Sequence, residues 1–442
     1  MEAIASYFKF AERKTDLSTE IRAGVTTFMV MAYIIFLNPN IISGPLGLDP
    51  IAVATGTALI AGIMTIVMGV IGNYPFAIAA GLGLNAIVAF GLTAQGLDAK
   101  GAMGVILIEG IIILVLVLAG FREAVMNAVP LALKRAIGVG IGLFILFIGF
   151  VDGGLIVPGV PVVQVAFPTT PAQFVFIIGL LITIGLYVLK IRAALIISII
   201  ATAIIALAAG VTPVPSPLTL SPNFATLGLG LQDPFQVFTR LPAITAVLTI
   251  FAIMLADFFD TMGTVTGVAE QAGLAREDGS VPNMKNVLLV DSVAAIAGGV
   301  GGVSSNTTYI ESAAGVAEGG RTGFASVVTG ALFLVAVLLA PLTQLIPLVT
   351  TAPVLVLVGY LMFTLIKDID VSDVEDGLPA LLTMILMPLT YNITVGIGAG
   401  FISWVFIKAV RRKWSEIHPL MWIVAIAFLI YFLTSYIQTV IK

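Results

Sequence analysis

The amino-acid sequence predicts an all-α polytopic membrane protein with 14 transmembrane segments, arranged as two inverted repeats of seven. Hydrophobic residues make up 59% of the 442 positions, and charged residues only 10%. A soluble domain carries about a quarter charged residues, which cover its surface. The basic residues fall almost entirely on one side of the predicted segments, and two segments in matching places are broken by glycine. These three observations predict the fold class and the repeat.

The charge balance and the rare residue types exclude several classes of function. The net charge is −4 and there is no basic tract, so nucleic-acid binding is not expected. The chain has no Cys and a single His, His418, which excludes disulfides, thiolate metal sites and histidine-built metal sites. We therefore expect neither a metal nor a cofactor. Residues 1–22 are mixed in charge and lack the pattern of a cleavable signal.

Apolar stretches of about 20 residues match the thickness of the hydrocarbon core. In the first half of the chain they lie at 22–43, 51–72, 76–95, 101–121, 131–150, 172–189 and 192–210. A Pro-rich break at 211–240 follows, and the second half contains 241–267, 286–302, 303–318, 321–344, 350–367, 376–391 and 393–410. A further apolar stretch, 418–437, is either a fifteenth crossing or a helix at the membrane interface.

The basic residues orient these segments. With the N-terminus inside and alternating crossings, 17 of the 20 Lys and Arg lie on the inner side. Only Lys100 and Arg240 fall outside, and Lys442 lies at the C-terminal tail. This asymmetry follows the positive-inside rule. We therefore expect a multi-pass protein of the cell (plasma) membrane with a cytoplasmic N-terminus.

The third segment of each half is short and interrupted. Residues 75–90 contain an extended stretch, after which Gly81 and Gly83 open a short helix that carries Asn85. Residues 298–315 contain a glycine cluster, a polar stretch and a helix predicted to begin near Tyr309. Each half has seven segments, and an odd number of crossings ends on the other side of the membrane. The second half therefore enters the membrane from the side opposite to the first. Inverted repeats with broken helices in matching positions are typical of secondary transporters, whose site lies near the middle of the membrane.

Four acidic residues lie deep in apolar segments, where a carboxyl group is costly and usually functional. Asp257 and Asp260 are three residues apart and therefore share one face of a predicted helix. Glu311 lies in the second broken segment. We expect Asp257 and Glu311 to accept N–H donors or to hold a proton, and Asp260 either to share that role or to tie its helix to a neighbour. For Glu109, which has no motif around it, structural burial is the favoured interpretation.

Other ionisable residues lie near the ends of the predicted segments. For Asp291 and Glu318, either solvation at the interface or pairing with a base, such as Glu318 with Arg321, is a sufficient explanation. His418 stands beside a proline at the start of the C-terminal stretch and is interpreted as a boundary residue.

Three motifs resemble the signatures of one known family. They are AGLGLNA (80–86), ADFFDTMGTVTG (256–267) and SSNTTYIESAAGVAEGGRTG (304–323). They look like those of nucleobase–cation symporters in the nucleobase–ascorbate transporter superfamily, specifically the AzgA-like adenine–guanine–hypoxanthine permeases. The likeness covers residues 8–413, and the wider superfamily, with its uracil and xanthine permeases, shares the TTYIE stretch at 307–311.

The resemblance implies that a core domain, segments 1–4 and 8–11, moves against a gate domain, segments 5–7 and 12–14. It also implies a short strand followed by a half-helix in segments 3 and 10. The implied boundaries are 1–128 (core), 129–211 (gate), 212–240 (external Pro-rich linker), 241–345 (core), 346–413 (gate) and 414–442 (an extra C-terminal apolar helix).

The resemblance further implies the substrate and the residues that bind it. Such a transporter imports purine nucleobases (hypoxanthine, guanine and adenine) by proton symport with alternating access. The substrate-binding positions map to Asn85, Asp257, Thr308 and Glu311, and the supporting or proton-coupling positions to Asp260, Gly83 and Tyr309. Sodium in place of the proton stays open, and a homodimer within the lipid bilayer is compatible with the family.

Other functions fit parts of the same sequence. A uracil or xanthine permease, or an inorganic anion carrier, would share the fold, but two acids beside the site would repel an anion. An intramembrane aspartyl protease places its two aspartates on separate helices, one of them in a G-x-G-D setting. Asp257 and Asp260 share one helix and no G-x-G-D occurs, so an enzyme is not expected. A channel would differ from a carrier in rate and saturation.

Overall fold

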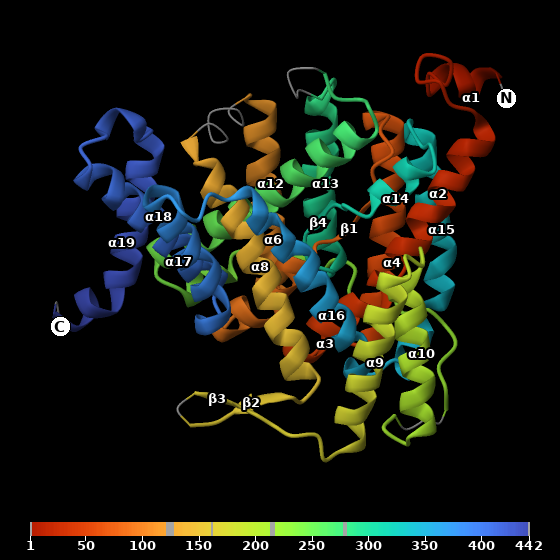
Figure 1. Cartoon of the computed structure of the whole chain (residues 1–442), viewed down its shortest axis with the longest axis horizontal. Coiled ribbons are helices and arrows are strands. Elements are labelled where there is room, and N and C mark those ends of the chain that lie inside the picture. Colours follow the sequence, from red (N-terminus) through yellow and green to blue (C-terminus); the bar gives the residue numbers. More distant parts are fainter. Residues whose placement is uncertain (1, 121–127, 161, 213–216, 277–280, 441–442) are drawn as a thin grey trace.

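The computed structural model describes residues 2–120, 128–160, 162–212, 217–276 and 281–440, with side chains up to residue 433. Arg122 and Lys442, two of the basic residues counted above, lie outside the described residues. Helices dominate the chain, and the described part adds two short two-stranded sheets. The N-terminal helix lies at one corner of the molecule and the C-terminal helix at the opposite edge (Figure 1).

In the first half of the chain, helices and strands form close to where the apolar stretches predict segments. They are α1 (Glu2–Tyr7), α2 (Leu17–Met31), α3 (Ile34–Leu46), α4 (Pro50–Val67), η1 (Met68–Gly72), β1 (Ile78–Ala80), α5 (Leu82–Ala86), η2 (Ile87–Leu92), α6 (Ala99–Leu118), α8 (Leu131–Asp152), β2 (Ile156–Pro158), β3 (Val163–Val165), α9 (Pro171–Val188) and α10 (Ala194–Ala208). The strand–helix order of the third segment is therefore confirmed.

The second half contains, in its described residues, a further series of helices and one strand. They are η3 (Leu229–Leu231), α11 (Gln236–Arg240), α12 (Ala243–Gln271), α13 (Met284–Gly301), β4 (Asn306–Thr308), α14 (Ser312–Ala317), α15 (Gly323–Ala336), η4 (Val337–Leu345), α16 (Leu348–Phe363), η5 (Thr364–Asp368), α17 (Val374–Thr390), α18 (Ile393–Val410), η6 (Trp414–Glu416) and α19 (Pro419–Val440). Again a short strand, β4, precedes a short helix, α14, in the middle of the half.

Ten helices in the described part of the chain are long and apolar enough to cross a membrane. Shorter apolar helices lie at Leu82–Leu92, Ala194–Ala208 and Pro419–Leu433. Helices of this kind satisfy their backbone hydrogen bonds internally, which a lipid environment requires. The chain is therefore a helical membrane protein with about ten apolar spans by length and composition.

Small residues let these helices pack closely. A Cβ atom on Gly323 in α15 would lie 1.9 Å from the carbonyl oxygen of Gly69 in η1, so neither position tolerates a side chain without a shift. Helix α15 packs on α4 and α2, and α6 packs on α13. In a second group α8 packs on α16 and α17, and α17 packs on α18. Close approach through glycine is typical of helix interfaces in membranes.

Three parts of the chain differ from a simple series of spans. In the linker predicted at 212–240, the Gly228 N–H donates to the Val300 carbonyl at 2.7 Å and η3 packs against α6, so residues 228–231 are folded onto the helices. Strands β2 and β3 form an antiparallel hairpin that hydropathy alone did not predict. Helix α19 packs on α18 at the edge of the molecule (Figure 1).

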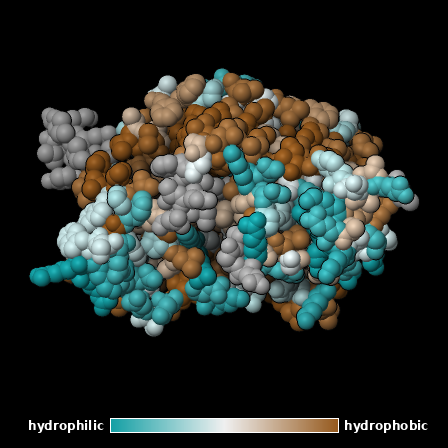
Figure 2. Space-filling model, turned by 90° about the horizontal axis from the view of Figure 1, so that it is seen from above, coloured by the Kyte–Doolittle hydropathy of each residue, from teal (hydrophilic) through white to brown (hydrophobic). Residues whose placement is uncertain are grey.

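Several predicted inner basic residues gather at one end. Lys9, Arg13, Lys14 and Arg321 line a polar cavity of about 660 Å³ between the N-terminal segment, the end of α12 and the start of α15. Figure 2 views the molecule from this end and shows hydrophilic side chains over much of it, with hydrophobic ones along one flank. The charges that the sequence assigns to one side of the membrane are thus close together here.

Candidate functional site

The two short strands of the broken segments meet near the centre of the molecule (Figure 1). β1 and β4 pair antiparallel, with Ile78 opposite Thr308 and Ala80 opposite Asn306. The ladder continues at both ends, because Gly81 donates its N–H to Ser305 and Tyr309 donates its N–H to Ala77, each at 2.9 Å. The pairing satisfies backbone groups that would otherwise be exposed at membrane depth. It also joins the two halves of the chain at one point.

Helix α12 presents its two aspartates to strand β4. The hydroxyl of Ser305 donates to Asp257 Oδ2 at 2.7 Å, and the hydroxyl of Thr307 donates to Asp260 Oδ2 at 3.4 Å. Asp257 is only 1% exposed, whereas Asp260 is exposed. The predicted common face of the two acids is confirmed, and it points to the ladder. The same face carries one buried carboxyl group and one that is open.

Glu311 stands at the start of the second half-helix. The hydroxyl of Tyr33, from α3's N-terminal end, donates to Glu311 Oε1 at 2.6 Å. The helix was predicted to begin near Tyr309 and to carry Glu311, but α14 begins at Ser312 and Glu311 is its N-cap residue. The reason is that the Tyr309 backbone is still held by the ladder, and the Tyr309 hydroxyl donates to the Ala80 carbonyl. Tyr309 thus ties β4 to β1.

Asn85 is the polar residue of the first half-helix. It is fully buried in α5, and neither its Oδ1 nor its Nδ2 atom has a hydrogen-bond partner among the described residues. A buried amide without partners is rare in native proteins and requires an explanation. Nearby, a Cβ atom on Gly83 would lie 2.4 Å from Ile141 Cγ2 of α8, so the half-helix is in tight contact with that helix.

Asp291 was interpreted from the sequence as a span-end residue, and the structure gives it a different role. It is 6% exposed on α13 and accepts hydrogen bonds from the Thr308 N–H (3.1 Å), the Thr308 hydroxyl (2.9 Å) and the Thr261 hydroxyl (2.8 Å). It therefore anchors β4 and α12 to α13 instead of lying solvated at a span end. Its position as an acid in an apolar helix was the feature of the sequence that could have indicated this role. Tyr33 and Ser305, which were missed, carry no signal in the sequence.

Glu109 reaches the same region from α6. It is fully buried, and the side chain it meets is Asp257, with the charge of Asp291 also acting on it. Asp260 in turn is within electrostatic reach of both Asp257 and Glu311. The structure thus brings acids from α6, α12, α13 and the start of α14 around one strand pair. Carboxyl groups ringed by hydroxyls accept N–H donors and exchange protons.

Comparison with known proteins identifies the family. A family model described as a permease family matches residues 18–399. The chain belongs to this permease family. The guanine/hypoxanthine permease PbuG of Bacillus subtilis is 39% identical to this permease, over 97% of the chain and 99% of that protein. The adenine permease AdeQ of Escherichia coli is 36% identical, over 96% of the chain and 95% of that protein.

The solved structures extend the comparison to the fold. The transmembrane domain of a cyanobacterial bicarbonate transporter, BicA, superposes with a TM-score of 0.66 at 15% identity, covering 87% of this chain and 97% of that one. At that identity the likeness concerns the fold alone. The permease is thus a multi-span membrane transporter of the nucleobase permease family, and its relatives are permeases, not enzymes.

Proposed function

We propose that this permease imports purine nucleobases (hypoxanthine, guanine and adenine) by proton symport. The observation that carries the proposal is the convergence of Asp257, Asp260 and Glu311 on the β1–β4 ladder, beside the buried and unpartnered amide of Asn85. The named activities of PbuG and AdeQ, which match along almost the whole chain, support the same substrate class.

The chemistry of a purine base suits these groups. The base is flat and largely uncharged, and its edges carry N–H donors beside carbonyl or ring-nitrogen acceptors. Asp257 and Glu311 would accept N–H donors, and the Asn85 amide would supply one donor and one acceptor. Thr308 would join by exchanging its bond to Asp291 for one to the base, while Gly83 and Tyr309 support the two half-helices. A missing hydrogen bond in a buried site costs about 1–3 kcal/mol, which supplies selectivity.

The proposed architecture is 14 segments in two inverted repeats, with a core (1–128 and 241–345) that moves against a gate (129–211 and 346–413). The packing of α2, α4 and α15, and separately of α8, α16, α17 and α18, supports this division. The two groups touch at Gly83 against Ile141 and at Phe90 against Tyr391, whose ring centroids are 5.5 Å apart.

The orientation, with a cytoplasmic N-terminus in the plasma membrane, is open to direct measurement. Because the chain has no Cys, single cysteines introduced at Lys9, Lys100 and Arg240 have no background. We expect an impermeant maleimide to label positions 100 and 240 in intact cells and position 9 only after permeabilisation. Labelling of all three in intact cells would contradict the orientation.

Uptake into proteoliposomes tests the function and the site together. An inward proton gradient should drive accumulation of radiolabelled hypoxanthine by the wild type, and unlabelled guanine and adenine should compete. Glu311→Gln and Asp257→Ala should abolish this uptake while the proteins stay folded. Unaltered uptake in both variants would remove the site assignment. If uptake requires sodium and is not inhibited by an uncoupler, the coupling ion is sodium and not the proton.

An inorganic anion carrier is the second candidate, because the fold of the bicarbonate transporter BicA is similar. The acids around the ladder disfavour it, since a carboxylate repels an anion and carries no donor for it. Bicarbonate and sulfate should therefore leave hypoxanthine uptake unchanged. Competition by either anion at concentrations near those of the bases would favour this alternative.

A further inference from the structure

Glu109 is a buried acid to which the proposed function assigns no role in binding the base. It lies about ten residues from either end of α6, or about 15 Å along the helix axis, and its side chain is fully buried. No N–H or O–H donor in the described part of the chain reaches either of its carboxyl oxygens. No described Lys or Arg forms an ion pair with it. Structural burial, which the sequence favoured, would call for such partners.

The groups that face Glu109 are themselves acids. Helix α12 contributes Asp257, whose carboxyl group lies next to Glu109, and α13 contributes Asp291, whose charge acts on Glu109. Of the other elements packed on α6, η2 and η3 carry no charged residue, and α11 places the uncharged Gln236 against Gly101, eight residues before Glu109. Two carboxyl groups form a hydrogen bond with each other only when one of them carries a proton. The contact between Glu109 and Asp257 is therefore a place for a proton.

Asp257 connects this proton to the ligand. Asp257 Oδ2 accepts a hydrogen bond from the hydroxyl of Ser305 on the β4 side of the ladder, so one carboxyl group lies beside both Glu109 and the candidate site. Asp257 accepts an N–H donor of a base best when it is ionised. A base bound there would therefore place the shared proton on Glu109, and departure of the base would let the proton return to Asp257 or leave.

We propose that Glu109 carries the proton that is transported with each base, with Asp257 as the group that senses the base. This inference rests on the proposed function of proton-coupled purine import. The proton is taken up by the acid pair on the outer side, stays on Glu109 while a base occupies Asp257, and is released with the base on the inner side. Nothing else is consumed in the cycle.

The test uses the full chain in proteoliposomes and separates transport from coupling. Glu109→Gln keeps the shape of the side chain and removes the exchangeable proton. We expect exchange of internal for external hypoxanthine, without any gradient, to stay within about threefold of the wild type. Uphill accumulation driven by an inward proton gradient, and acidification of a pH dye trapped inside, should fall at least about tenfold. The exposed Glu12→Gln is the matched control and should change neither.

The possible results distinguish a failure of the proposed purine import from a failure of the proton role of Glu109. A wild type that takes up no purine removes the proposed function and the inference with it. The wild type could couple uptake to the proton gradient while Glu109→Gln still accumulates hypoxanthine and acidifies the interior. That result overturns only the role of Glu109. A folded Glu109→Gln variant that loses exchange as well also overturns it, because Glu109 would then serve binding. If Glu109→Gln does not fold, Glu109→Asp should shift the pH at which driven uptake is half-maximal, and an unchanged profile overturns the inference.

Discussion

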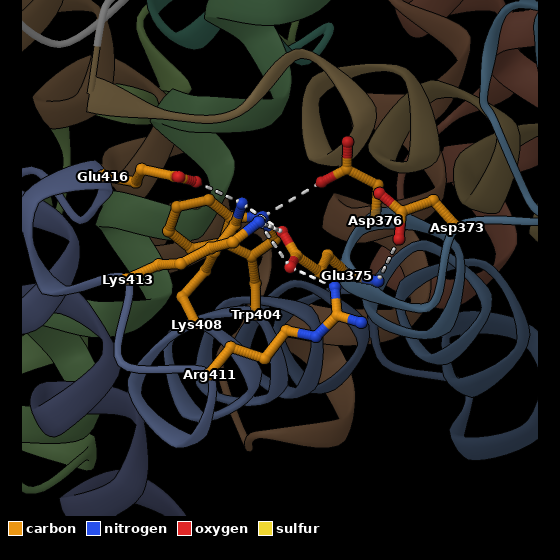
Figure 3. A network of polar contacts seen from close by, with 8 residues as sticks. All are labelled: Asp373, Glu375, Asp376, Trp404, Lys408, Arg411, Lys413 and Glu416. Atoms are coloured by element: carbon orange, nitrogen blue, oxygen red, sulfur yellow. Dashed lines mark hydrogen bonds and ion pairs between the residues drawn. The ribbon is translucent and has the colours of Figure 1, made fainter.

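Two buried glutamates, Glu109 and Glu375, have opposite surroundings. Glu375 lies in the first turn of α17, where Lys408 Nζ approaches its Oε2 to 2.5 Å, Lys413 Nζ approaches Oε1 to 2.7 Å and Arg411 also pairs with it. Figure 3 shows these three cations converging on the one carboxylate. The charged groups that act on Glu109 from the described residues are two other acids, Asp257 and Asp291. The same side chain is a fixed structural anion in one place and a site for an exchangeable proton in the other.

The network around Glu375 has a clear structural task. Lys408 also pairs with Glu416 at 2.6 Å, and the Trp404 indole N–H donates to Asp376 at 3.1 Å (Figure 3). These contacts join α17 and α18 to η6 and so fix the chain before α19 begins. A buried charge is tolerated when it is paired in this way. Pairing therefore distinguishes acids that hold the fold from acids that are available to a ligand or a proton.

The largest effect should come from exchanging the carboxylate for an amide at each of the two positions. Glu375→Gln leaves Lys408, which is nearly buried, with less compensation, and loss of one partner of a buried pair is strongly destabilising. We expect a lower melting temperature and less folded protein, measured by tryptophan fluorescence on heating in detergent. Glu109→Gln should keep or raise the melting temperature, because an amide needs no proton beside Asp257. Equal destabilisation by both changes would contradict the comparison.

A smaller effect is expected at Ser305, whose hydroxyl is a neutral donor to Asp257 at 2.7 Å. Hydrogen bonds to charged groups contribute about 1.5–3 kcal/mol, so Ser305→Ala should weaken hypoxanthine binding by about 10-fold to 100-fold. The matched control is Ser304→Ala, because the adjacent Ser304 hydroxyl is buried without a partner. Competition of unlabelled hypoxanthine for uptake measures both. Equal losses in the two variants would indicate a general effect on the strand.

A smaller effect on hypoxanthine affinity is expected from removing the donor to Glu311, which is the hydroxyl of Tyr33. Tyr33→Phe removes the 2.6 Å hydrogen bond to Glu311 Oε1 and keeps the ring. Because the other proposed binding groups stay in place, we expect apparent affinity to fall by about threefold to tenfold, which corresponds to about 1 kcal/mol. Tyr74→Phe is the control, since the Tyr74 hydroxyl donates to the Pro282 carbonyl away from the ladder. If only the maximal rate changed, Tyr33 would act on the movement of the protein and not on binding.

Much of the fold follows from local composition. Apolar stretches of membrane length predicted helices close to their observed positions, and the glycine-broken segments correctly predicted a strand and a short helix in each half. The start of α14 was placed too early, because the turn at Tyr309 depends on β1, a distant partner. The packing of η3 and α11 onto α6 also depends on contacts between distant residues, whereas the β2–β3 hairpin is local and was missed because its short strands lie in a loop between apolar stretches.

The site was predictable only in part, for the same reason. Acids in apolar helices are conspicuous, so Asp257, Asp260 and Glu311 were candidates before the structure placed them beside the ladder. Their donors, Tyr33 and Ser305, are ordinary residue types in ordinary segments, and only the folded chain brings them within 2.7 Å of an acid. The partner of a charged side chain in an ion pair is equally hard to predict from spacing in the sequence.

Glu318 pairs with Arg192 and not with Arg321, which was the partner suggested for it, and this pair gives the smallest prediction. Arg321 donates to the Val316 and Gly320 carbonyls, both at 2.7 Å, while Glu318 pairs with Arg192 at 2.5 Å. Arg192 lies between α9 and α10 and its side chain is 66% exposed. Exposed ion pairs contribute about 0–1 kcal/mol, so Arg192→Ala should leave stability unchanged and alter transport by at most about twofold.

A double-mutant cycle measures what the exposed pair contributes. Arg192→Ala, Glu318→Gln and the double variant should have the same melting temperature, and any small differences should vanish at high salt, because exposed charges are screened. This outcome would place the pair at the opposite extreme from Glu375, whose cations hold a buried carboxylate. A large, salt-resistant coupling in transport rate, with stability unchanged, would instead mean that the pair joins α14 to the α9–α10 loop in one conformation and must break during transport. Exposure would then be a poor guide to which ion pairs matter in this permease.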